Sequence, residues 1–146
     1  MKTISHLTPE DFQDAFSIET ASHAFPWSEK TFLSNQGERY LNLKVVKNGK
    51  IVGFAIVQVV LDEATLFNIA VKPDHQGQGF GRYLLEHLIE QLKQKRVTTL
   101  WLEVRASNTK AIHLYQSMGF NEAAIRHNYY PARQGREDAV IMALYI

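Results

Sequence analysis

Residues 68–82 read NIAVKPDHQGQGFGR, and this stretch decides the fold. The apolar run up to Val71 favours a strand, and glycines at positions 77, 79 and 81 favour a tight loop. Such a loop brings backbone N–H groups close to a ligand, at the start of a helix where unpaired donors and the positive dipole end converge. The stretch predicts a strand, a glycine-rich loop and a helix that together bind a pyrophosphate, with Arg82 adding positive charge. A glycine-rich turn without a ligand is the alternative.

The helix after this loop is predicted by apolar residues at positions 84, 85, 88, 89 and 92, which share one helical face. Upstream, the β-rich runs 41–46, 51–61 and 65–71 predict an antiparallel meander, and Asn48-Gly49 between the first two is a strong hairpin signal. Before them, a short strand precedes a helix that starts near Thr8 and is broken by Pro26. A second short helix follows Ser28.

Downstream, the pattern predicts strands at 98–104, 120–126 and 139–145 and a short helix from Ser107 or Asn108 to Gly119. The predicted fold class is therefore α/β (α+β), with about four helices and a mixed, mostly antiparallel twisted sheet of about six or seven strands. No linker, repeat or low-complexity segment divides the chain, so we expect a single domain over residues 1–146.

The composition favours a soluble cytoplasmic protein. Of 146 residues, 45% are hydrophobic and 21% charged, and the N-terminus lacks the apolar core of a secretory signal. No run approaches the length of a membrane helix. The net charge of +1 shows no basic face for direct nucleic-acid binding, and the six histidines lack metal-ligand spacing. The absence of cysteine excludes thiolate chemistry.

Two nucleotide sites compete for the predicted pyrophosphate loop. A nicotinamide dinucleotide site is the serious rival, because Glu103 follows the last glycine at the spacing of a ribose-binding acid. However, the glycines are spaced G-x-G-x-G rather than G-x-G-x-x-G, and five residues separate Val71 from the first of them. A nucleoside triphosphate loop is excluded because no Gly-Lys-Ser/Thr follows.

The chain resembles the Gcn5-related N-acetyltransferase (GNAT) family. The family's Q/R-x-x-G-x-G/A motif is met by Gln76, Gly79 and Gly81, and its later motif by Asn108, Ala111, Tyr115 and Gly119-Phe120. Within the family, the stretches 23–27, 35–40, 102–105 and 128–131 are most similar to bacterial ribosomal-protein-alanine N-acetyltransferases. The resemblance covers nearly the whole chain, with no departure at a motif position.

This resemblance implies acetyl-coenzyme A (acetyl-CoA) as co-substrate and no metal. The strand before the loop is expected to diverge from its neighbour, so that its backbone pairs with the coenzyme arm and polarises the thioester carbonyl. The residues it assigns to the coenzyme are Ile69, Ala70, Val71, Gln76, Gly77, Gln78, Gly79, Phe80, Gly81, Arg82, Asn108 and Tyr115. Asn108 also suits a helix cap, and that role competes for the same side chain.

The expected catalytic residues are Glu103 and Tyr115. Glu103 shares a strand face with Trp101 and is the candidate general base, although a salt-bridging surface glutamate would look the same. Tyr115, on one helix face with Asn108 and Ala111, is the candidate general acid, although such a stripe also suits packing. Tyr129-Tyr130-Pro131, Glu137-Asp138 and the loop around Trp27 are expected to form an acidic, aromatic acceptor cleft, unless the two acids are simply solvated.

The expected function is direct acetyl transfer in a ternary complex, to the N-terminal alanine of a small-subunit ribosomal protein. The acceptor follows from the resemblance alone. Two alternatives stay open: an enzyme acting on another amine, such as a small molecule or a lysine, and a binding module that holds acetyl-CoA without turnover.

Overall fold

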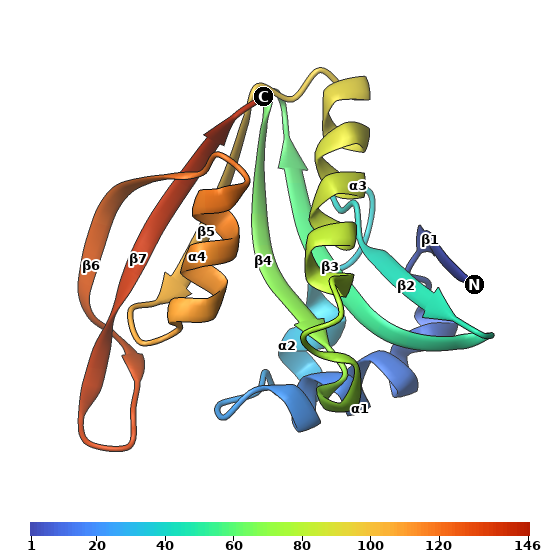
Figure 1. The fold of residues 1–146 in the computed structure, drawn as a ribbon, viewed down its shortest axis with the longest axis horizontal. Coiled ribbons are helices and arrows are strands. Elements are labelled where there is room, and N and C mark those ends of the chain that lie inside the picture. The colour runs from blue at the N-terminus through green and yellow to red at the C-terminus, as the bar shows by residue number, and fades with distance from the viewer.

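Seven strands form one sheet in the order β1-β2-β3-β4-β5-β7-β6, and the computed structural model describes all 146 residues (Figure 1). The strands are β1 (Lys2–His6), β2 (Leu43–Lys47), β3 (Lys50–Val60), β4 (Glu63–Val71), β5 (Thr99–Arg105), β6 (Asn121–Pro131) and β7 (Arg136–Tyr145). Only β4 and β5 pair in parallel, so the sheet is mixed and mostly antiparallel, as predicted.

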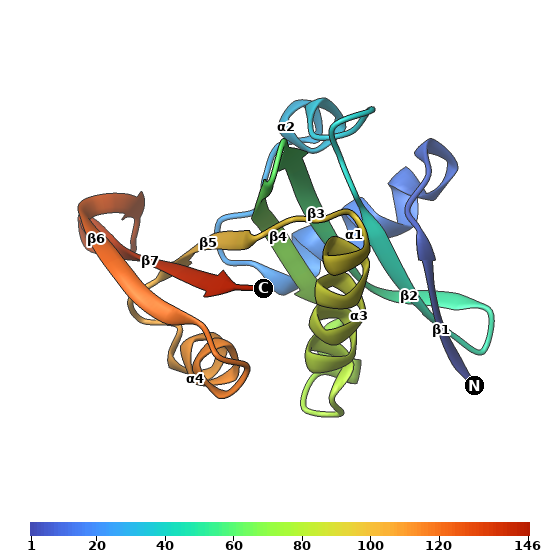
Figure 2. The same ribbon diagram turned by 90° about the horizontal axis from the view of Figure 1, so that it is seen from above.

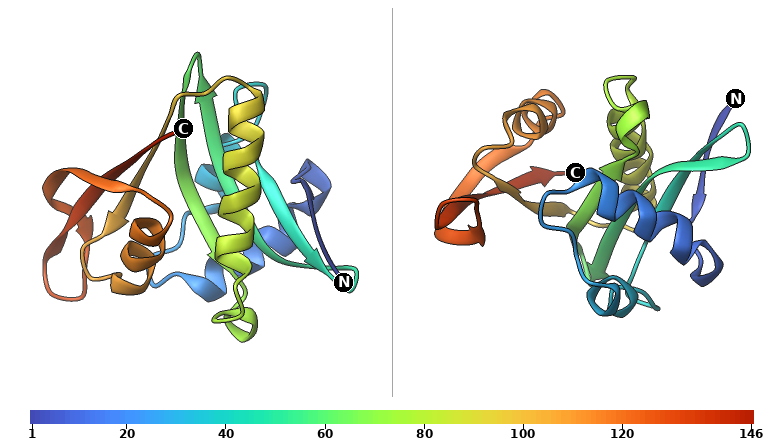
Figure 3. Two further views of the ribbon diagram at one scale, coloured as in Figure 1. Left: turned by 45° about the horizontal axis from the view of Figure 1, so that its top comes forward. Right: turned by 90° about the horizontal axis from the view of Figure 1, so that it is seen from below.

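Helices cover both faces of the sheet (Figures 2 and 3). They are α1 (Phe12–Ser22), α2 (Glu29–Ser34), α3 (Phe80–Gln94) and α4 (Thr109–Ser117), with short 3-10 turns at Pro9–Asp11 and Pro73–His75. α1 and α2 lie on one face, and α3 and α4 lie on the other. None of the helices is long and apolar enough to cross a membrane.

The main core lies between α3 and the sheet. Leu84, Leu85, Leu88 and Leu92 are completely buried there, which is the apolar face that the sequence periodicity predicts. A smaller core on the opposite face joins α1 and α2 to β3 and β4 and includes Phe32 and Phe54. The central strands are therefore covered on both faces, which fixes β4 rigidly between two packed layers.

The feature that creates the site is the divergence of β4 from β5. The two strands pair only from Glu63 to Leu66 on β4. Phe67 is an extra residue in the β3–β4 ladder, because Ile56 faces Asn68 while Val57 faces Leu66. Such a bulge bends a strand and increases its twist. Beyond Phe67, β4 stays paired with β3 but no longer with β5. The divergence confirms the expectation drawn from the family.

Three predicted boundaries were wrong, and one of them is the start of β7, which lies at Arg136 rather than at residue 139. The first helix ends at Ser22 rather than at Pro26, because His23 already has an extended backbone (φ −115°, ψ 138°). β6 continues to Pro131, five residues beyond the predicted end, because two bulges interrupt its pairing with β7 and hide the alternation. The second bulge contains Asn128, whose φ is 52°.

Candidate active site

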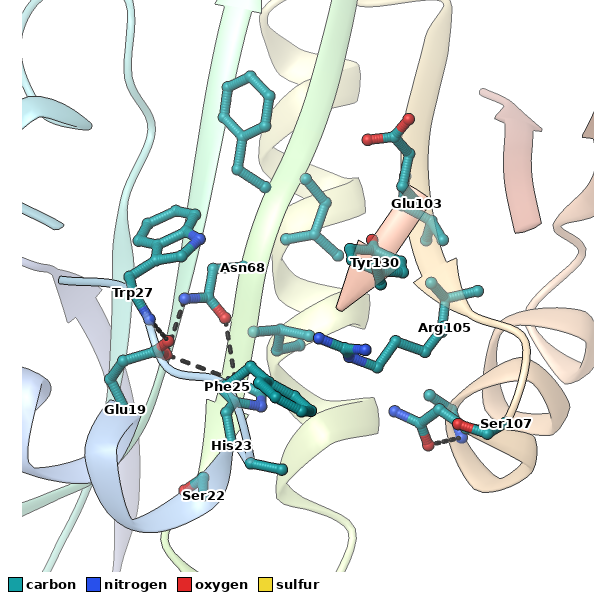
Figure 4. Close-up of a pocket in the computed structure, with 18 of the residues that line it drawn as sticks. Glu19, Ser22, His23, Phe25, Trp27, Asn68, Glu103, Arg105, Ser107 and Tyr130 are labelled. Atoms are coloured by element: carbon teal, nitrogen blue, oxygen red, sulfur yellow. Dashed lines mark hydrogen bonds and ion pairs between the residues drawn. The ribbon is translucent and has the colours of Figure 1, made fainter. Parts of the chain in front are cut away.

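A pocket of about 590 Å³ fills the opening between β4 and β5 (Figure 4). One wall is formed by β4 and the segment after α1, and the other by β5, α4 and the end of β6. The wall residues include two predicted catalytic side chains, Glu103 and Tyr115, and two predicted coenzyme residues, Ile69 and Asn108. Residues far apart in the sequence therefore meet at one cavity.

Glu103 projects from β5 into this pocket because strand side chains alternate. Its neighbours Leu102 and Val104 are buried, whereas the Glu103 side chain keeps 30% of its exposure. Its Oε2 lies 2.9 Å from Nε of Arg126, which comes from β6. The sequence did not predict this ion pair. A carboxylate that borders both the pocket and water is able to accept a proton directly or through a water molecule.

Tyr115 enters the pocket from α4, where Asn108 caps the helix by accepting a hydrogen bond from the N–H of Ala111 (3.3 Å). The Tyr115 ring is 95% buried against the main core and packs at 5.6 Å from Phe120. Its hydroxyl has no hydrogen-bond partner in the chain. The hydroxyl oxygen is nevertheless accessible to solvent, because no buried side-chain oxygen or nitrogen of the protein lacks a partner. Burial, and secondarily the nearby Tyr130, raises the pKa of Tyr115. The phenol therefore stays protonated at neutral pH.

The unpaired edge of β4 carries three of the predicted coenzyme residues. Ile69 lines the pocket, whereas the Ala70 side chain is buried in the core under α1. The carbonyl of Val71 accepts hydrogen bonds from Gln76 Nε2 (2.9 Å) and Ser22 Oγ (3.1 Å). The N–H of Lys72 donates a hydrogen bond to the carbonyl of Val52 on β3 (2.7 Å). Because backbone groups alternate along an antiparallel strand, the backbone of Ala70 also faces β3, whereas that of Ile69 and Val71 faces the open edge. Gln76 holds the loop against the strand.

The glycine loop lies outside the pocket lining and leads into α3. Gly77 and Gly79 have φ of 77° and 86°, which favour glycine, and a Cβ on either residue would meet nothing within 4 Å. The N–H groups from Gln78 to Arg82 donate no hydrogen bond within the chain, because the first in this helix comes from Tyr83. The loop thus offers a set of free donors beside open space.

Other side chains of the loop have structural roles. Phe80 is buried in the main core, and Arg82 donates a hydrogen bond to Ser117 Oγ on α4. The Gln78 side chain donates a hydrogen bond to the carbonyl of Asp74 (3.4 Å). Gly81 has an ordinary helical φ, and a Cβ there would touch Leu114 at 3.6 Å. The structure provides no cluster of three or more His, Asp or Glu side chains that could hold a metal ion.

The structure brings only some of the residues expected in an acidic, aromatic acceptor cleft to the pocket. Trp27, Tyr130 and Pro131 line the pocket, but Tyr129, Glu137 and Asp138 do not. Glu137 accepts hydrogen bonds from Ser107, and Asp138 accepts one from the N–H of Asn128 (2.9 Å). These two acids therefore stabilise the turns around the pocket rather than line it.

Arg105 bridges the two walls and was missed by the sequence analysis. Its guanidinium lies 4.8 Å from the ring centre of Phe25 and 4.5 Å from that of Tyr130. It also donates a hydrogen bond to the carbonyl of Pro131 (2.7 Å) and lies 3.6 Å from Glu137. Arg105 thus connects the segment after α1 to the β6–β7 hairpin across one end of the pocket (Figure 4).

Glu19 forms a polar cluster with His23 and Asn68 on the β4 side of the pocket, and this cluster was also missed. The signal was present in the sequence. Ala15, Ile18 and Glu19 have the spacing of one helical face, so Glu19 is a charged residue on a buried stripe. A buried carboxylate on such a stripe needs hydrogen-bond donors, and these are supplied here by the backbone of Trp27 and by Asn68.

A family model for the acetyltransferase (GNAT) family matches residues 1–120. The chain belongs to this family. It is 68% identical over its whole length to the [ribosomal protein bS18]-alanine N-acetyltransferase of Escherichia coli K12, and covers 99% of that protein. The Haemophilus influenzae enzyme of the same description is 58% identical, with both chains fully covered.

The fold agrees equally well with a solved member of the family. The crystal structure of the ribosomal-protein-S18-alanine N-acetyltransferase from Escherichia coli superimposes with a TM-score of 0.98, over 100% of this chain and 94% of that chain. The nicotinamide dinucleotide alternative is thereby overturned, since the glycine loop belongs to the GNAT fold.

Proposed function

We propose that this protein is an N-terminal acetyltransferase that moves the acetyl group of acetyl-CoA to the α-amine of the N-terminal alanine of ribosomal protein bS18. The observation that carries the proposal is the convergence of Glu103 and Tyr115 on one pocket. The full-length similarity to enzymes described by this activity supports the choice of acceptor. The cytoplasm, where ribosomal proteins are made, is the compartment that this proposal implies.

The residues present fit acetyl-CoA. The free N–H groups from Gln78 to Arg82 suit a pyrophosphate, and the positive φ of Gly77 and Gly79 leaves space for it beside the backbone. The unpaired edge of β4 presents the backbone of Ile69 and the N–H of Val71, which are available for hydrogen bonds to an extended amide-bearing arm, with Ala70 between them facing β3. Bound acetyl-CoA supplies an acetyl thioester, which is an acyl group already activated toward amines.

Glu103 is the proposed general base. An α-amine has a pKa of about 7.7–8.0, so a base is needed to complete deprotonation as the new C–N bond forms. The ion pair with Arg126 holds the carboxylate in place without removing it from the pocket. We propose that Glu103 accepts the proton of the α-amine, either directly or through one water molecule.

Tyr115 is the proposed proton donor to the departing sulfur. Its ring is fixed in the core, whereas its hydroxyl has no competing partner within the chain. Because its pKa is raised by burial, Tyr115 carries its proton at neutral pH. Because the chain has no cysteine, it offers no thiol to carry the acetyl group, and we propose direct transfer from acetyl-CoA to the amine.

The test is an acetylation assay with a peptide that carries the N-terminal sequence of bS18, together with acetyl-CoA. Thiol release and peptide mass are followed in parallel. We expect one acetyl group on the α-amine, and none on a matched peptide whose α-amine is blocked but which retains a lysine. Acetylation of the blocked peptide would instead indicate a lysine acceptor. Binding of acetyl-CoA without thiol release would contradict the proposal and favour a binding module.

A further inference from the structure

The Glu19–His23–Asn68 cluster connects three chain segments at the wall opposite Glu103 (Figure 4). Glu19 is 99% buried, and its two carboxylate oxygens accept hydrogen bonds from the N–H of Trp27 and from Nδ2 of Asn68, both at 2.8 Å. Because Nδ2 of Asn68 faces this carboxylate, its Oδ1 is turned toward His23. The orientation of the Asn68 amide is therefore determined by its partners.

These contacts also determine the tautomer of His23. Its Nε2 lies 3.1 Å from Asn68 Oδ1 and 3.4 Å from Glu19 Oε1, and both of these oxygens can only accept. Nε2 must therefore carry a hydrogen. Nδ1 of His23 has no partner in the chain, and in the neutral ring it has a free lone pair. The side chain lines the pocket and is 37% exposed, so this nitrogen is accessible to a ligand.

An acceptor that binds as an α-ammonium needs two proton acceptors, whereas one that binds as the neutral amine needs only one. An α-ammonium must lose one proton before its nitrogen can attack, and a second one as the C–N bond forms and the C–S bond breaks with its electron pair on sulfur. One proton ends on the sulfur and one is released to water. Glu103 accepts the second proton from the nitrogen, and Tyr115 donates the proton that ends on the sulfur. None of the residues assigned so far accepts the first proton from the nitrogen.

We propose that His23 accepts the first proton, from the α-ammonium of the acceptor, at Nδ1. Glu19 and Asn68 are positioning residues that hold the imidazole in the required tautomer. This inference rests on the proposed function, and it makes the pocket competent to bind the charged form of the acceptor rather than only the neutral amine.

The other titratable groups around the pocket are already engaged or lie apart from His23. Glu103 pairs with Arg126, and Arg105 pairs with Glu137 and Pro131. Tyr115 and Tyr130 have raised pKa values because they are buried. None of them forms a hydrogen bond or ion pair with His23, whose only ionisable partner is Glu19.

The variant His23→Gln separates a chemical role from a structural one. The glutamine amide can still donate to Glu19 and Asn68 from the position of Nε2, but it lacks the acceptor atom Nδ1. His113 on α4 is exposed and lies outside the pocket, so His113→Gln is the matched control. Both variants are assayed with the bS18 peptide, and acetyl-CoA affinity and thermal midpoint are measured to verify folding.

We expect His23→Gln to lose kcat/KM by a factor that depends on pH. With an acceptor pKa of about 7.7–8.0, roughly a tenth of the amine is neutral at about pH 7, so kcat/KM of His23→Gln falls about tenfold there. At about pH 9 the amine is mostly neutral, and the defect shrinks to less than about twofold. Glu19→Gln shows the same pH-dependent pattern if it acts through His23.

The inference is overturned if His23→Gln keeps the wild-type kcat/KM at neutral pH, or if it loses kcat/KM equally at both pH values. Either result leaves the proposed function intact. Wild-type protein that acetylates no α-amine overturns both. His113→Gln retains wild-type kcat/KM at both pH values, and a defect as large as that of His23→Gln would also overturn the inference.

Discussion

Arg126 Nε lies 2.9 Å from Glu103 Oε2, although β7 separates the strands that carry them. The arginine thus reaches across one strand to contact the proposed base. Both side chains are partly exposed, at 54% and 30%, so the pair contributes little to stability, about 0–1 kcal/mol. Its consequence is positional, because it limits the directions that the Glu103 carboxylate can take at the pocket.

Replacing Glu103 with Gln should slow the enzyme without stopping it. The amide oxygen can still accept a hydrogen bond from Arg126, but it cannot take up a proton. We expect kcat to fall about 10²-fold, the lower end for loss of a general base, with the thermal midpoint nearly unchanged. Initial rates with the bS18 peptide measure this. Glu122→Gln on the exposed face of β6 is the control, and equal rates in all three proteins would exclude Glu103 as the base.

Tyr115→Phe should separate catalysis from packing. The ring contacts in the core are retained, and the hydroxyl that is lost has no partner in the chain, so we expect the free energy of unfolding to change by less than about 1 kcal/mol. We expect kcat to fall about 10²-fold while acetyl-CoA affinity is kept. Urea unfolding measures the free energy of unfolding, calorimetric titration measures the acetyl-CoA affinity, and initial rates measure kcat. Loss of stability without loss of kcat would mean that Tyr115 is a packing residue.

The sequence predicted the elements of this fold well, because their signals are local. The leucines of α3, the Asn48-Gly49 turn and the alternation in β5 each lie within a few neighbouring residues. The predicted catalytic pair also lies at one pocket, since both residues occupy recognisable motif positions. That they act as base and acid stays a prediction.

The contacts that the sequence did not predict all join distant segments. Arg105 contacts Phe25 and Tyr130, and Glu19 contacts Asn68, which is 49 residues away. Residue type alone does not reveal such partners, because the divergence of β4 and β5 that brings them together depends on a bulge at Phe67. A bulge adds one residue to one strand and leaves no clear mark in the apolar pattern.

Stability should decrease at high pH because of the pocket tyrosines. Burial, and secondarily Glu103, raises the pKa of Tyr130 to about 12, and burial also raises the pKa of Tyr115. Since the unfolded phenol has a pKa of about 10, the folded state binds these protons more tightly. Their stabilising contribution is complete below about pH 10 and is lost as the pH rises toward about 12.

Urea unfolding at a series of pH values between about 9 and 12 measures this loss of stability. We expect Tyr130→Phe to flatten the decline, whereas Tyr145→Phe, at a position that is 78% exposed, should leave it unchanged. An identical decline in Tyr130→Phe and wild type would show that Tyr130 is not protonated more tightly in the folded state.

Alanine at two neighbouring glycines should change stability in opposite directions. Gly79 has a φ of 86°, where a Cβ costs about 1–2 kcal/mol, so Gly79→Ala should lower the free energy of unfolding and weaken acetyl-CoA binding. Gly81 lies within α3 with an ordinary φ, and its Cβ would touch Leu114 at a normal 3.6 Å. Gly81→Ala should therefore raise the free energy of unfolding by about 0.5–1 kcal/mol. Urea unfolding and calorimetric titration of both variants test the pair, and a destabilised Gly81→Ala would mean that α4 packs against this turn too tightly to admit one methyl group.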